Sequence, residues 1–105
     1  MQAQQTDSSD IEVAWLPSMP LIYKRKAPSI AGVGVLYSEE ADQIIDVFET
    51  TNLAQSLGTS MRRQSRALAR DPNCRICWLE ESDSSTRELL YKKLLQRVSR
   101  PLTTV

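Results

Sequence analysis

The residues best suited to chemistry are two cysteines three positions apart, Cys74 and Cys77, in the stretch NCRICWLEE. Two thiolates at this spacing can supply half of a tetrahedral zinc site, which needs four nitrogen, sulfur or oxygen donors. The sequence has no further cysteine and no histidine, so one chain cannot complete an ordinary site. Two chains that each donate one pair are the arrangement that remains open for zinc.

A redox pair is the second alternative for these thiols. Such a pair normally has its first cysteine at a helix N-terminus, which lowers the thiol pKa. Here the stretch alternates Cys74, Ile76 and Trp78 with Arg75 and Cys77, a pattern that predicts a half-buried strand over residues 74–79. The sequence therefore favours two buried thiols that behave as small hydrophobic side chains.

CRIC, followed by a tryptophan and two glutamates, also resembles the opening of the RING-variant zinc domains of some ubiquitin ligases. That resemblance implies a zinc-binding fold with further cysteine and histidine ligands. Those ligands are missing from the remainder of the chain, so we reject membership of that family.

The sequence offers few residues suited to acid–base catalysis. Histidine, the side chain that titrates nearest neutral pH, is absent. Asp42, Asp46 and Glu49 fall three and four positions apart, which on a helix would form one acidic edge able to hold a divalent cation; we favour a solvated acidic face. The glycines of GVG lack the further residues of a phosphate-binding loop. We therefore predict a protein that is not an enzyme and has no cofactor and no metal.

Hydrophobic periodicity predicts a small single α+β domain. Short N-terminal strands precede two helices, a strand and a C-terminal amphipathic helix. We expect a disordered tail over residues 1–10, the domain over 11–100 and a free tail over 101–105. The expected elements are strands at 11–15, 21–24 and 32–37, helices at 39–50 and 53–70, a strand at 74–79, and a helix over 86–99.

Local signals place the ends of these elements. Ser38 has the character of a helix N-cap, with two glutamates in the following turn. Asn52 is the expected break or new cap after residue 50, and Asp71-Pro72-Asn73 is a turn. Ser85 and Glu88 have capping-box spacing at the start of the last helix.

Charge is unevenly distributed along the 105 residues. Residues 1–56 carry eight acids and three bases, a net of −5, and residues 57–105 carry ten bases and five acids, a net of +5. The first residues show neither a basic nor an apolar segment of a signal peptide, and no apolar run approaches the ~20 residues that span a bilayer. We expect a protein of the cytoplasm, or of the nucleus if the source is eukaryotic or viral, with no membrane partner and no secretion.

Arg62, Arg63, Arg66 and Arg70 lie along one side of the second predicted helix. They can meet the acids of residues 42–49 across a helical pair, or bind an acidic partner. Nucleic-acid binding through this helix is the alternative, although the sequence has no zinc finger and no net positive charge.

Leu90, Leu94 and Val98 form an apolar stripe on the last helix, which can serve another protein or a homodimer; burial in the protein's own core is the interpretation we favour. RRQS makes Ser65 a candidate phosphorylation site. TTV, with Thr103 and Val105, fits a PDZ-type C-terminal motif. The composition thus indicates a small adaptor or regulatory protein, and its size suggests a viral or bacterial accessory factor.

Overall fold

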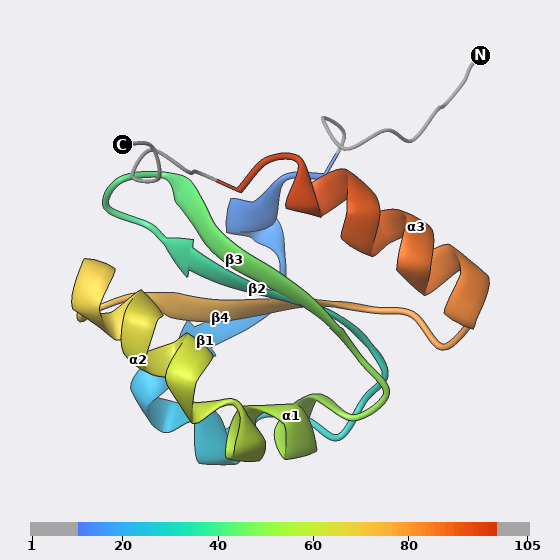
Figure 1. Cartoon of the computed structure of the whole chain (residues 1–105), viewed down its shortest axis with the longest axis horizontal. Coiled ribbons are helices and arrows are strands. Elements are labelled where there is room, and N and C mark those ends of the chain that lie inside the picture. Colours follow the sequence, from blue (N-terminus) through green and yellow to red (C-terminus); the bar gives the residue numbers. More distant parts are fainter. Residues whose placement is uncertain (1–10, 99–105) are drawn as a thin grey trace.

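The computed structural model describes residues 11–98, which fold into a four-stranded antiparallel sheet with helices on both faces (Figure 1). The strand order across the sheet is β1-β4-β2-β3. The predicted small α+β architecture is therefore confirmed. The elements are the 3₁₀ helix η2 (Val13–Trp15), β1 (Ser18–Pro20), the 3₁₀ helix η3 (Leu21–Lys26), β2 (Gly32–Ser38), β3 (Gln43–Thr50), α1 (Leu53–Thr59), α2 (Met61–Arg70), β4 (Arg75–Glu80) and α3 (Ser84–Leu95).

The helix predicted over residues 39–50 is wrong, because this segment forms a turn followed by the strand β3. The Ser38 hydroxyl does accept a hydrogen bond from a nearby backbone N–H, that of Ala41 (3.2 Å), but it closes a turn. Asp42 then adopts the left-handed conformation (φ 53°), which aspartate tolerates better than most residues. The chain reverses here, so β3 returns antiparallel to β2.

The hairpin of β2 and β3 contains one irregularity. Leu36 pairs with Asp46, whereas the next residue, Tyr37, pairs with Ile44, so Ile45 is the extra residue of a β-bulge. As a result both Ile45 and Asp46 face the side of the sheet that α2 covers, where Ile45 packs against the first core cluster and Asp46 reaches an arginine of α2.

The sheet separates two apolar cores. The first lies between the sheet and η3, α1 and α2, and includes Leu36, Leu57 and Ile76. The second lies between the opposite face and η2 and α3, and includes Val35 and Leu94. All seven residues of β2 are buried, because this strand is central and both of its faces are covered.

Gly34 is a position on β2 where there is no room for a side chain. The Phe48 ring of β3 lies directly over this glycine, and a Cβ added to Gly34 would collide with the ring. α2 also contacts this ring, because the Arg63 guanidinium lies over it, 5.1 Å from its centroid.

The strands predicted at 11–15 and 21–24 are also wrong. Of the first segment's alternating apolar residues, Val13 is buried but Trp15 is 85% exposed, and the segment contains the 3₁₀ helix η2. In the second, Leu21 is buried and its N–H donates to the Cys74 carbonyl (3.0 Å), after which the chain turns into η3. The N-terminal strand that forms is the short β1 between them, which pairs with β4.

The remaining helix boundaries combine successes and corrections. Asn52 caps α1, its side-chain oxygen accepting from the Gln55 N–H (3.1 Å). The predicted helix over 53–70 is interrupted at Ser60, whose φ/ψ of −100°/53° is not helical. The cap of α3 is Asp83 rather than Ser85, because the Asp83 carboxylate accepts from both the backbone N–H (2.9 Å) and the hydroxyl (2.8 Å) of Thr86.

Candidate interaction surfaces

The two cysteines lie on opposite sides of the sheet. Cys74 belongs to the core beneath α1 and α2, and Cys77 to the core beneath α3, and each is 1% exposed. Burial raises the pKa of Cys74 to about 11 and that of Cys77 to about 12. Both thiols are therefore protonated and enclosed by apolar groups, and they face different cores.

The three acids predicted to share a helix edge each have a different partner. Asp42 accepts from the Tyr37 hydroxyl, Asp46 pairs with Arg63 of α2, and Glu49 pairs with Arg87 of α3. Burial and the neighbouring carboxylate of Asp42 together raise the pKa of Tyr37 to about 12. Within residues 11–98 no group of three histidine, cysteine, aspartate or glutamate side chains could hold a metal ion.

The arginines of α2 differ in their surroundings. Arg63 donates through Nε to Asp46 Oδ2 at 2.9 Å, so the expected contact with the acids of residues 42–49 exists at one position, across a helix–strand interface. Arg62, Arg66 and Arg70 are exposed, and no carboxylate of residues 11–98 lies within 4.0 Å of their guanidinium groups.

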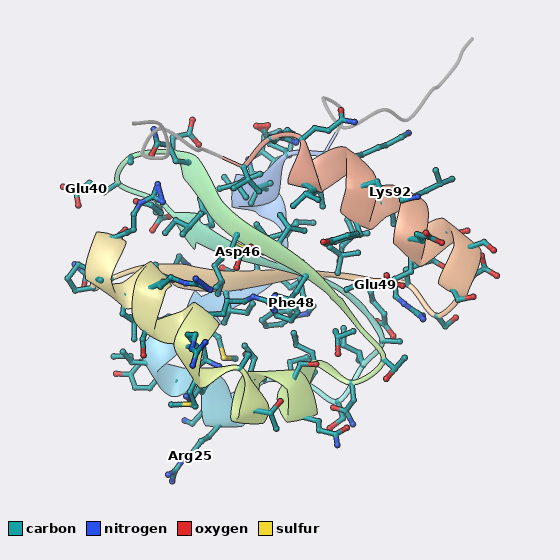
Figure 2. All side chains as sticks on the ribbon, viewed as in Figure 1. Arg25, Glu40, Asp46, Phe48, Glu49 and Lys92 are labelled. Atoms are coloured by element: carbon teal, nitrogen blue, oxygen red, sulfur yellow. The ribbon has the colours of Figure 1, made fainter. Side chains whose placement is uncertain are left out.

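A second group of cations lies beside these arginines. The Lys24 ammonium of η3 donates to Gln64 Oε1 (2.7 Å) and lies 3.3 Å from Met61 Sδ, which ties η3 to α2. Arg25 and Lys26 follow on the same short helix and are exposed, and Figure 2 shows Arg25 pointing away from the protein. We call the combined surface the basic face; its cations are Lys24, Arg25, Lys26, Arg62, Arg63, Arg66 and Arg70.

Sequence reasoning missed this convergence. KRK at 24–26 is the only basic run in the acidic half of the chain, and that contrast was the available signal. Lys24 joins it to α2 through contacts with Gln64 and Met61, and neither of these two residues was a candidate site residue in the sequence. Gln64 is 2% exposed, and its amide nitrogen donates to the Leu57 carbonyl (2.6 Å) and the Ser60 hydroxyl (3.0 Å), so its side chain is fixed in place for the contact with Lys24.

A groove of about 500 Å³ lies between α2 and β3. Ile45, Ala67 and Ala69 supply its apolar surface. The charged groups that line it are Asp46, Arg63, Arg66 and Arg70. A smaller cavity of about 220 Å³ lies between η2 and the turn of the β2–β3 hairpin, where Tyr37 and Asp42 meet.

The predicted stripe points into the second core, but the last helix ends at Leu95 and not at residue 99, so Val98 lies beyond α3 in a β-bridge with Ile44. Leu94 is completely buried, and Leu90 and Val98 are partly buried against the same cluster. The structure thus packs these side chains into or against the protein's own core, which is the interpretation favoured above. Ser65 is exposed on α2, and Thr103 and Val105 lie outside the described residues.

None of the helices in residues 11–98 has the length and apolar character needed to cross a bilayer.

No protein-family model matches this chain, and a search of the curated proteins found no relative.

Proposed function

We propose that this chain is a small non-catalytic adaptor or regulatory protein that binds an acidic surface of another protein through its basic face. The observation that carries the proposal is the set of exposed cations that η3 and α2 bring together, among which Arg62, Arg66 and Arg70 have no carboxylate neighbour within residues 11–98. Unneutralised guanidinium groups on adjoining elements are suited to multi-donor contacts with carboxylates.

Exposed apolar side chains on the same two helices support a protein partner. Ile22 and Tyr23 of η3 and Met61 of α2 are 64%, 55% and 54% exposed. Tyrosine, methionine and arginine are the residue types enriched in protein–protein interfaces. A surface for the phosphate backbone alone would gain little from exposed isoleucine and methionine.

Nucleic-acid binding is the second candidate, because the basic face has more cations than the arginine helix alone. Its affinity should fall steeply with salt, roughly as the number of phosphates contacted. A protein interface that buries apolar side chains responds less to salt.

A binding experiment with native lysate tests both candidates. The tagged protein is compared with Arg62→Ala/Arg66→Ala and with the control Lys92→Ala/Lys93→Ala, which removes two charges from α3 on the other side of the sheet. We expect the arginine pair to abolish capture and the lysine pair to leave it intact, with and without nuclease. Capture that nuclease abolishes would support the nucleic-acid function instead. A captured set that the arginine substitutions leave unchanged would refute a role for the basic face.

A further inference from the structure

Within residues 11–98, β3 has an outer edge that is largely unpaired. It is the last strand in the sheet order, and Figure 1 shows it at the front of the molecule with α3 above it and α1 and α2 below it. Val98 forms a single parallel bridge with Ile44 at the beginning of the strand. This edge therefore already accepts extended backbone at one residue, and in residues 11–98 no other strand pairs with the rest of it.

The backbone groups that face outward from this edge can be assigned from one hydrogen bond. The Val47 N–H donates to Asp46 Oδ1 at 2.9 Å, so it is not directed at β2. Because backbone groups alternate between the two sides of an antiparallel strand, the N–H of Glu49 points to the same outer side. An added strand would pair with these two residues.

The groove between β3 and α2 lies beside this edge. Ile45 and Ala67 give it apolar surface, while Arg66 and Arg70 have no carboxylate neighbour within residues 11–98. Side chains on one face of an added strand would point toward α2, where they would meet both the apolar surface and the arginines. The charge of the groove thus favours acidic residues in that strand.

Asp46 already makes the two contacts that such a ligand would make. One of its oxygens accepts from the edge N–H of Val47, and the other accepts from Arg63 Nε, both at 2.9 Å. Figure 2 shows Asp46 between β3 and α2. Its side chain is one-third exposed, so solvent reaches it and an incoming acidic strand can displace it.

We infer that the edge of β3 beside α2 binds an extended acidic segment of a partner protein by strand addition, with Asp46 as an internal competitor for the same donors. This inference deepens the proposed function, on which it rests: it names the binding mode and the chemistry of the partner segment. Main-chain hydrogen bonds to an open edge supply affinity, and side-chain contacts supply specificity, in this mode of recognition.

Fluorescent peptides provide the test. The probe is a peptide of alternating glutamate and valine, with an alternating lysine–valine peptide as the charge control. A third peptide has the glutamate–valine sequence with N-methyl groups on alternate backbone nitrogens, which keeps its charge but removes the donors that a β-ladder needs. We expect binding of the first peptide only, detected by fluorescence anisotropy.

Variants of the protein separate the contributions. Arg66→Ala/Arg70→Ala should weaken binding of the glutamate–valine peptide about tenfold or more, since loss of about 1.4 kcal/mol corresponds to a factor of ten. Asp46→Ala should strengthen it several-fold because it releases both donors. Lys92→Ala is the control and should have no effect. Far-UV circular dichroism of each variant confirms that it is folded.

The outcomes are distinguishable. If the N-methylated peptide binds equally well, strand addition is wrong while an acidic partner for the basic face stands. If neither glutamate–valine peptide binds but a protein is still captured through Arg62 and Arg66, the strand-addition site is wrong and the proposed function survives. Dimerisation of the protein that the peptide does not displace would make a second copy the occupant, and preferential binding of single-stranded DNA at this groove would make it a nucleic-acid site; either result overturns the inference.

Discussion

Arg87 is the buried cation that joins α3 to the sheet, and its removal should be costly. It is 7% exposed, and its Nε donates to Glu49 Oε2 of β3 at 3.1 Å. Its Nη1 donates to the carbonyls of Glu81 and Ser82, at 3.3 and 3.1 Å, in the loop that precedes α3. One guanidinium thus holds together a strand, a loop and a helix.

The expected loss follows from these contacts. Hydrogen bonds to a charged group each contribute about 1.5–3 kcal/mol when buried. The Glu49 carboxylate is one-third exposed, so its share is reduced by solvent screening to about 1 kcal/mol. The two loop carbonyls can turn partly to water in the variant. We expect Arg87→Ala to lower the free energy of unfolding by about 2–3 kcal/mol, a large share of the ~5–15 kcal/mol typical of a domain.

Lys92→Ala is the matched control, because it also removes a cation from α3. Lys92 pairs with Glu88 one turn away at 3.2 Å, and both side chains are more than half exposed. Such a pair contributes only about 0.3–0.5 kcal/mol. With a urea m-value of roughly 1 kcal/mol per molar, Arg87→Ala should lower the midpoint by about 2–3 M and Lys92→Ala by less than about 0.5 M.

Urea unfolding followed by tryptophan fluorescence measures both variants, and a double-mutant cycle of Arg87→Ala with Glu49→Ala measures the coupling of that pair. We expect a coupling of about 1 kcal/mol. Equal midpoint shifts for Arg87→Ala and Lys92→Ala would refute the assignment of Arg87 as a structural tie.

Three further predictions concern the cores. Cys74 and Cys77 should not react with a thiol reagent at neutral pH until the protein is unfolded, because burial holds both thiols protonated; rapid reaction of the native protein would contradict this. Since the native pKa values of about 11 and 12 exceed the ordinary thiol value of 9.0, the unfolded state loses these protons first. The contribution of the two protonated thiols to stability is complete below pH 9 and falls as the pH rises toward 11. The raised pKa of Tyr37 adds a similar loss of stability above pH 10. Urea midpoints should therefore decline across this pH range. Leu94→Ala should cost about 2–5 kcal/mol through the cavity it leaves, whereas Leu95→Ala, at an exposed site, should cost less than about 0.5 kcal/mol; comparable thermal shifts for the two would argue against the second core.

The sequence predicted elements where local pattern and final environment agree. β2 and β4 were predicted from apolar alternation, and the second half of the long middle helix from its spacing. The apolar residues of 39–50 satisfied helical spacing, yet Ile44, Ile45, Val47 and Phe48 are also β-branched or aromatic types that fit a pleated sheet. Pairing with β2 decided between the two, and that contact between distant residues is invisible to local periodicity.

The same limitation applies to the candidate surfaces. The arginines of α2 were predicted as a group, but their union with η3 depends on the position of Gln64 and on a break at Ser60 that only the folded chain reveals. The groove was not predicted at all, because residues 42–49 were assigned to a helix. A strand assignment there would have exposed the possibility of an open edge.

The two edge strands of the sheet differ in their ability to pair with a further strand, and this limits how copies of the molecule could associate. At one end lies β1, three residues long and containing Pro20, which has no N–H to offer. At the other lies β3, eight residues long. Head-to-tail stacking of sheets needs two receptive edges on each copy, whereas the sheet formed by residues 11–98 has one. Copies that pair through their backbones would therefore form a closed dimer through β3 and could not add further copies. Growth into fibres is thus disfavoured, although β3 remains able to pair with another strand.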